Sequence, residues 1–448
     1  MTRGEPTPRS IQGTYLGLMF GNTLAASLIW GINTIFLLDA GLSNLEAFTA
    51  NAFFTAGMVV FEVPTGIVAD TAGRRLSYLL GTVTLAGSTL LYVGLWEIEG
   101  PFWAWAAASM LLGLGFTFFS GAVEAWLVDA LTATGFTGTV ESVFARGQIV
   151  SGVAMLGGSV AGGFIAEQTS LAVPFVLRGV ILAAMFGVAF ALMHDLGFTP
   201  EKGGGIPSEV RKVASASVEY GWRVPAVKWL MLESLAMGGV GIYAFYAMQP
   251  YLLELWGDPQ AYQIAGLVAA IVAGAQICGG IAAPWIRRQF TRRTSALILI
   301  AVLNVVTLGL IGLADSFWPV LGLIVVWGLL FAAAMPIRQT YLNGMIPSRQ
   351  RATILSFDSL MGSSGGVWTQ PLLGRAADVW GYAPSYVMGA GISALAVPFL
   401  ALSRRENAPA DTLDLTELRA VREERPLHEQ VQVPVCGDER ATGAAVAP

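Results

Sequence analysis

The chain has 448 residues, of which 54% are hydrophobic and 12% are charged, and its formal net charge is −5. Ordinary soluble proteins carry roughly a quarter charged residues. Because even large soluble domains keep much of their surface in water, this composition excludes a typical cytosolic enzyme and a disordered protein. It indicates a membrane protein that crosses the bilayer several times.

Long apolar windows follow one another along the chain. A membrane-spanning helix needs about 20 predominantly apolar residues. The windows are too long for barrel strands of about ten alternating residues, and lipid favours segments that satisfy their own backbone hydrogen bonds. The sequence therefore predicts an all-α membrane protein with twelve spans, at 10–38, 44–69, 76–96, 100–123, 147–166, 172–194, 234–253, 260–286, 294–314, 317–337, 352–377 and 379–403.

Basic residues collect in alternate connections, and this asymmetry orients a membrane protein. The opposite connections are mostly acidic, with Asp39, Glu97 and Glu254 as examples. We therefore expect a multi-pass protein of the cell membrane with both termini in the cytoplasm. The cytoplasmic basic residues are then Arg3, Arg9, Arg74, Arg75, Lys202, Arg211, Lys212, Arg223, Arg287, Arg288, Arg292, Arg293, Arg349, Arg351, Arg404 and Arg405.

The longest internal connection, 196–222, contains three consecutive glycines, prolines and mixed charges. Short repeats relate the spans on either side of it, which indicates a duplicated six-helix unit. The matched pairs are 112–129 with 327–344, 163–167 with 374–378, and 66–69 with 280–283. The predicted organisation is a cytoplasmic arm (1–10), a six-helix bundle (11–195), a cytoplasmic linker (196–222), a second six-helix bundle (223–403) and a polar tail expected to be disordered (404–448).

The connection between the second and third spans is very short and carries regularly spaced glycines and charges. It reads Gly66-x3-Asp70-x2-Gly73-Arg74-Arg75. Gly66 permits close helix contact, Gly73 permits a tight turn, and the Asp70 carboxylate suits a neighbouring helix N-terminus. The alternative interpretation is an ordinary cytoplasmic loop with turn glycines.

This segment resembles the signature loop of the major facilitator superfamily, G-x-x-x-D-x-x-G-R-[RK], although Thr71 replaces a common basic residue. With the twelve duplicated spans, the resemblance covers residues 10–403. It implies a secondary transporter in which two pseudo-symmetric bundles rock about a central site. It also implies that the loop is a cytoplasmic latch of the outward-facing state, with Asp70 facing the eleventh span and Arg74 paired with Asp129. Alternatively, Asp129 only solvates a helix end.

Small residues recur at helical intervals in the fifth span, in the string Ala145-x8-Ala154-x3-Gly158-Ser159-x2-Gly162-Gly163. The string partly resembles the antiporter motif of drug/proton exporters, which favours export. Gly158, Gly162 and Gly163 are the positions that match it best. The alternative is close helix packing without any further role.

Ionisable residues inside the spans are candidate functional groups, because each costs about 2.5–3.5 kcal/mol on insertion scales. Arg338 and Asp358 can instead form an ion pair, and Arg178 is expected to snorkel outward, with contact to an anionic substrate as the alternative. Protonation of a buried carboxylate can couple to conformation. We take four residues as proton-coupling candidates, with the first two preferred: Glu62, Glu124, Glu233 and Asp358.

Polar and aromatic residues within the first, seventh and tenth spans are candidates for a substrate cavity, because those spans line it in the superfamily. They are Asn22, Asn33, Tyr243, Tyr246, Arg338 and Gln339. Together with the acids, an aromatic cavity would suit amphipathic or cationic compounds. Hydrogen bonding between helices is the alternative role for these groups.

The sequence therefore predicts a transporter that exports small organic compounds in exchange for protons. The alternatives are an importer or anion carrier of the same superfamily, or a membrane sensor or scaffold that transports nothing. Isolated histidines and cysteines give no metal-binding or catalytic pattern, so we expect no enzyme and no cofactor. The expected partners are a small-molecule substrate, protons and the lipid bilayer, without nucleic acid. The oligomeric state is left open, with a monomer as the simplest case.

Overall fold

The computed structural model describes residues 6–200, 211, 215, 217–346 and 351–412. The linker 196–222 and the tail 404–448 therefore lie partly outside the described residues. Four of the basic residues that oriented the chain also lie outside them: Arg3, Lys202, Lys212 and Arg349.

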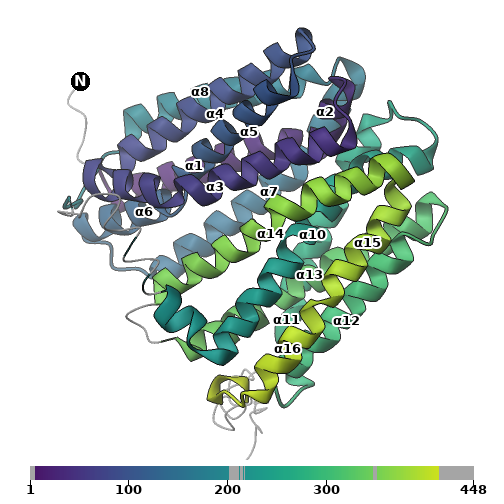
Figure 1. Cartoon of the computed structure of the whole chain (residues 1–448). Coiled ribbons are helices and arrows are strands. Elements are labelled where there is room, and N and C mark those ends of the chain that lie inside the picture. Colours follow the sequence, from purple (N-terminus) through teal and green to yellow (C-terminus); the bar gives the residue numbers. More distant parts are fainter. Residues whose placement is uncertain (1–5, 201–210, 212–214, 216, 347–350, 413–448) are drawn as a thin grey trace, which may run out of the picture.

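The first half of the chain is a bundle of helices, coloured purple to blue in Figure 1. Lipid offers no hydrogen-bond partners to the backbone, so these apolar segments form helices, which pair their own N–H and C=O groups. In chain order they are α1 (Pro8–Trp30), α2 (Asn33–Asp39), α3 (Asn44–Ala72), α4 (Arg74–Glu97), α5 (Phe102–Thr117), α6 (Ala122–Ala133), α7 (Val140–Gln168) and α8 (Ala172–Leu192).

The second half forms a similar bundle beside the first, coloured teal to yellow in Figure 1. A π-helical turn, η1 (Ser217–Trp222), precedes it, and a 3₁₀ turn, η3 (Pro409–Asp411), follows it. Its helices are α10 (Pro225–Trp256), α11 (Tyr262–Arg288), α12 (Arg293–Ile311), α13 (Phe317–Met345), α14 (Arg351–Trp380), α15 (Tyr382–Ala394) and α16 (Ala396–Arg405).

The helical membrane architecture expected from the sequence is confirmed. Within the described residues, 10 helices are long and apolar enough to cross a membrane, and the bent pair α1–α2 raises this number to 11. The remaining expected span corresponds to α14, which has 30 residues but is less apolar. Helix α14 packs between α3 and α10, so its polar side chains can face protein instead of lipid.

Three expected spans are broken helices. The first bends by 47° between α1 and α2. The fourth is interrupted between α5 and α6, where Gly121 adopts a left-handed conformation with φ of +68° that residues with a side chain rarely adopt. The last breaks at Leu395, between α15 and α16. Sequence windows show hydrophobic length but not these breaks.

A carboxylate caps the N-terminus of the third membrane span of each half, α4 in the first and α12 in the second. Asp195 follows α8 and accepts a 2.9 Å hydrogen bond from the backbone N–H of Arg75, the second residue of α4. Asp411 follows α16 and accepts a 2.8 Å hydrogen bond from the backbone N–H of Thr294, the second residue of α12. Both contacts satisfy free N–H groups at a helix N-terminus. The start of the expected disordered tail, up to residue 412, is thus folded onto the second half.

Candidate transport site

A cavity of about 400 Å³ lies between the two halves of the molecule. Its volume is within the range of small-molecule sites. Both halves contribute to its wall, which is mainly aromatic and aliphatic. The lining residues are Ile29, Trp30, Asn33, Asn51, Phe54, Met58, Tyr92, Leu112, Phe116, Arg178, Gly241, Ile242, Phe245, Tyr246, Gln276, Trp327 and Phe331.

The charged residue of this wall is Arg178, in α8. The residue is only 3% exposed, and its guanidinium lies 5.8 Å from the centre of the Phe116 ring. The expectation that Arg178 snorkels outward is therefore wrong. The expected acidic character of the cavity is also wrong, because none of the candidate carboxylates is among the lining residues.

Two amides lie beside each other in the cavity wall, at the start of α2 and in α3. The side-chain nitrogen of Asn33 donates to the side-chain oxygen of Asn51 at 3.3 Å. The nitrogen of Asn51 has no hydrogen-bond partner among the described residues. The cavity thus contains an unused amide donor as well as the Arg178 guanidinium.

The six expected cavity residues fall in different places. Asn33 and Tyr246 line the cavity. Asn22 instead accepts a 2.7 Å hydrogen bond from Tyr78 inside the first half. Tyr243 is 1% exposed and shares a 2.5 Å hydrogen bond with Ser385, which is the helix-to-helix role left open by the sequence. The other two lie on α13, where Gln339 is exposed and Arg338 forms ion pairs.

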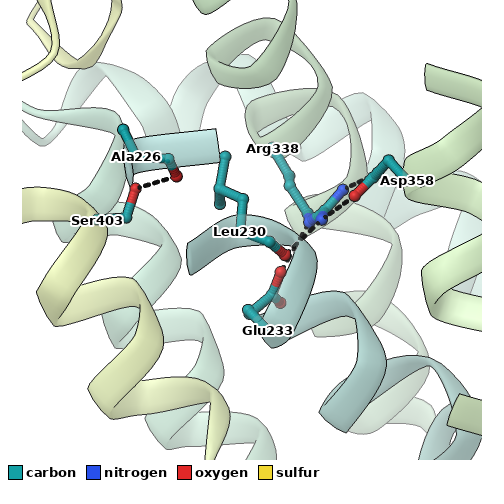
Figure 2. Close-up of polar contacts among 6 residues, drawn as sticks. All are labelled: Ala226, Leu230, Glu233, Arg338, Asp358 and Ser403. Atoms are coloured by element: carbon teal, nitrogen blue, oxygen red, sulfur yellow. Dashed lines mark hydrogen bonds and ion pairs between the residues drawn. The ribbon is translucent and has the colours of Figure 1, made fainter. Parts of the chain in front are cut away.

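Arg338 is held between two carboxylates that come from different helices. Its guanidinium donates to Asp358 of α14 at 2.6 and 2.7 Å and to Glu233 of α10 at 2.7 Å. It also donates to the Leu230 carbonyl oxygen at 2.9 Å, as Figure 2 shows. The three charged side chains are between 9 and 12% exposed. The pairing of Arg338 with Asp358 is confirmed, and Glu233 completes a buried triad with one cation and two acids.

The two preferred carboxylates, Glu62 and Glu124, lie in the first half near the break between α5 and α6. Glu62 of α3 accepts a 2.7 Å hydrogen bond from Ser120, which lies within this break. Glu124 stands in the first turn of α6. Both side chains are half-buried.

The glycines of the signature loop have different surroundings. A Cβ atom at Gly66 would contact nothing within 4 Å, so this glycine does not serve the close helix contact that we expected. Gly73 has a φ of +114°, and a Cβ there would lie 2.5 Å from the Asp195 carboxylate. Gly73 therefore allows both the turn and the cap that Asp195 places on α4. Asp195 was not among the residues expected from the sequence, because no local pattern distinguishes it.

The charges of the signature loop are paired within the first half. Arg74 forms an ion pair with Asp70, four residues earlier, and its guanidinium lies 5.8 Å from the centre of the Phe198 ring. The expected partner, Asp129, is not in ion-pair contact with Arg74 in this conformation. Asp70 likewise has Arg74 as its partner here, and its carboxylate forms no hydrogen bond or ion pair with a described residue of α14.

The glycines of the fifth span allow helices to approach closely. Added Cβ atoms at Gly158 and Gly162 would lie 2.0 and 1.8 Å from atoms of α1. Gly163 faces the other half, and a Cβ there would lie 2.5 Å from the carbonyl oxygen of Tyr262 in α11. Close packing is therefore the geometry of this motif, both inside the first half and between the halves.

Two carboxylates join the halves at the end of the molecule where α3 and α11 begin, which we call the gate end. Asp378 of α14 accepts hydrogen bonds of 2.9 Å from the first two N–H groups of α3. Glu167 of α7 accepts one of 3.0 Å from the second N–H group of α11. The helices involved are equivalent in the duplicated design, so the two contacts are related by pseudo-symmetry.

A glutamine adds to the same closure by filling the break between α1 and α2. Gln249 of α10 accepts a 2.9 Å hydrogen bond from the N–H of Thr34 and donates one of 2.6 Å to the Trp30 carbonyl oxygen. All hydrogen bonds between described residues of the two halves lie toward the gate end. Among the described residues, hydrogen bonds therefore join the halves toward one end of the molecule.

Comparison with known proteins agrees with this architecture. The profile of the Major Facilitator Superfamily matches residues 15–369. The chain is 22% identical over 399 residues to the quinolone resistance protein NorA of Staphylococcus aureus (strain MRSA252), which covers 88% of this chain and 96% of that protein.

Solved transporters have the same fold. The nucleoside transporter NupG matches with a TM-score of 0.73 and 11% identity over 88% of this chain and 98% of its own. A D-xylose-proton symporter matches with a TM-score of 0.65 and 16% identity over 91% of this chain and 99% of its own. At these identities the likeness establishes the fold and leaves the substrate open.

Proposed function

This chain belongs to the major facilitator superfamily, and we propose that it exports small organic compounds across the cell membrane in exchange for protons. It is a multi-pass membrane transporter with a small-molecule substrate, and the direction and the coupling are the proposal. The observation that carries it is the cavity between two bundles whose hydrogen bonds to each other, among the described residues, all lie toward the gate end. Rocking of the bundles would open the gate end and close the other, which is alternating access.

The proposed direction rests on similarity to an exporter, and the expected orientation of the chain is compatible with it. With both termini in the cytoplasm, the gate end faces outward and the structure is inward-facing, ready to load substrate from the cytoplasm. The similarity to a quinolone resistance protein and the partial antiporter motif around Gly158 support export.

The triad of Glu233, Arg338 and Asp358 is the coupling site that the geometry supports best. Two ionised carboxylates around one guanidinium leave one excess negative charge in a poorly solvated place, and a single proton would remove it. The triad connects α10, α13 and α14, so protonation would change how these helices hold together. Glu62 and Glu124 are the corresponding candidates in the first half.

Transport into inverted membrane vesicles tests the proposal. We expect an inside-acid gradient to drive uptake of compounds from a panel of anionic, neutral and cationic aromatic molecules. Glu233→Gln should weaken the dependence of uptake on the gradient. Glu62→Gln and Glu124→Gln test whether the candidate carboxylates of the first half contribute to proton coupling. Glu141→Gln is the matched control, because Glu141 is exposed at the start of α7. Uptake that is the same with and without the gradient would refute proton coupling.

A further inference from the structure

We propose that the central cavity binds amphipathic organic anions, with an aromatic body between the two halves and one carboxylate or sulfonate paired with Arg178. The inference rests on the proposed function, because it names the substrate class of the same cavity. It replaces the cationic compounds expected from the sequence.

The first argument is the isolation of the Arg178 charge. Among the described residues its guanidinium makes no hydrogen bond and no ion pair, and its Nε atom is buried without a partner. Arg338 shows how this fold satisfies a buried guanidinium that needs no ligand, since two carboxylates and a carbonyl oxygen surround it. Among the described residues no carboxylate pairs with the Arg178 guanidinium, so a bound ligand can supply the anionic partner.

The second argument is the polarity of the neighbouring groups. The free amide nitrogen of Asn51 is a second donor without a partner in the cavity wall. Its own oxygen already accepts from Asn33, so this pair offers a hydrogen to a ligand. A guanidinium and an amide N–H complement a ligand that brings acceptor oxygens, and a carboxylate can bind the guanidinium through both oxygens.

The third argument is the large apolar surface around these donors. Trp30 and Phe245 meet edge to face with 6.3 Å between ring centres, and Trp327 stacks beside Phe331 at 5.7 Å. All four rings line the cavity. Such walls gain free energy by burying an apolar ligand body, and they offer nothing to a small hydrated inorganic oxyanion. The cavity therefore favours an organic anion over an inorganic one.

Equilibrium dialysis of the purified full-length protein with three naphthalene probes tests the inference. The probes share one ring system and differ in charge: 1-naphthoate, neutral 1-naphthamide and the cationic 1-naphthylmethylammonium. We expect 1-naphthoate to bind roughly tenfold more tightly than the amide, since a hydrogen bond to a charged group contributes about that much. Equal or tighter binding of either other probe, or no binding of 1-naphthoate at about 1 mM, would overturn the inference.

Variants then assign the preference to one side chain. Arg178→Gln should remove the preference for 1-naphthoate while leaving 1-naphthamide binding in place, which also shows that the cavity is folded. Arg178→Lys should keep part of the preference. Arg146→Gln is the matched control, because Arg146 is exposed on α7 and donates a 3.4 Å hydrogen bond to Gln12, outside the cavity wall. If Arg178→Gln binds 1-naphthoate like the unmodified protein, the assignment is wrong.

This experiment separates the inference from the proposed function. Dialysis measures binding without a gradient, so it does not depend on the direction or coupling of transport. Selective binding of 1-naphthoate without gradient-driven uptake would leave the ligand class standing and overturn proton-coupled export. Gradient-driven uptake of only neutral or cationic compounds, without 1-naphthoate binding, would leave proton-coupled export standing and overturn the ligand class.

Discussion

Two arginines inside the membrane-spanning helices show how differently one residue type can be used. Arg338 has carboxylates from two helices around it, whereas Arg178 stands in the cavity wall with an aromatic ring as its neighbour. A lone charge in a membrane span is costly, so each needs a compensating partner. The fold supplies that partner for Arg338, and for Arg178 a bound ligand can supply it.

The triad should contribute strongly to stability through Arg338. Arg338→Gln would leave Glu233 and Asp358 without their cation, and breaking a buried ion pair costs about 3–5 kcal/mol. Glu233→Gln should cost much less, because Asp358 keeps both of its hydrogen bonds to the guanidinium. Thermal unfolding in detergent compares the two. Equal loss of stability in both variants would contradict this description of the triad.

If the signature loop is a latch, Arg74→Ala should impair transport without impairing folding. Arg74→Ala removes the partner of Asp70 and the contact with Phe198, both of which lie at the surface of the first half. We expect membrane expression to be retained and gradient-driven uptake to fall severalfold. Arg9→Ala, which removes an exposed arginine near the same end, is the control. Unchanged uptake by Arg74→Ala would exclude a role of the loop as a latch.

The buried charged residues could be recognised in the sequence, but of their contacts only the pairing of Arg338 with Asp358 could be predicted. Arg338 and Asp358 could be paired because both lie at similar depth in neighbouring spans. Arg178 was misplaced, because one arginine in an apolar helix does not show whether it faces lipid or a cavity. Asp195 was missed because its partner, the N-terminus of α4, is 120 residues away in the chain.

At the scale of helices, the breaks are the features that hydropathy could not predict. The bend between α1 and α2 is stabilised by Gln249, a residue 215 positions from Thr34. The sequence showed a polar residue in an apolar helix but not the free backbone groups that it satisfies. Helix breaks in membrane proteins require such partners from other helices.

The glycines of α7 give a matched test of helix packing. Gly162→Ala would place a Cβ 1.8 Å from the Leu28 carbonyl oxygen, whereas Gly157→Ala would meet nothing within 4 Å. Overpacking typically costs about 1–3 kcal/mol, so only Gly162→Ala should lower the thermal unfolding temperature. Equal stability of the two variants would show that α1 and α7 can separate without cost.

At the scale of the molecule, the sequence predicted the all-α membrane fold and its duplication, because hydropathy and internal repeats are properties of the whole chain. It could not predict which end of the molecule is closed. That closure depends on contacts between residues 96 to 334 positions apart, and alternating access requires that they form and break.

The gate carboxylates make the closure testable. Asp378 and Glu167 each accept hydrogen bonds from a helix N-terminus of the other half, where a negative charge is favoured. Asp378→Asn combined with Glu167→Gln removes both charges with little change in shape. The double variant should therefore open the gate end more often, without loss of either bundle.

The most direct test of rocking bundles measures distances at both ends of the same protein. Spin labels at Glu97 and Asp315 report on the gate end, and labels at Ala133 and Gln289 report on the other end, in a Cys278→Ser, Cys436→Ser background. All four positions are exposed, and each pair has one label in each half of the molecule.

The account predicts that the double gate variant shifts the first distance distribution to longer values and the second to shorter values, as measured by pulsed electron paramagnetic resonance. Opposite shifts at the two ends are what rocking about a central cavity requires. Unchanged distances at both ends, or lengthening at both, would contradict alternating access through this cavity.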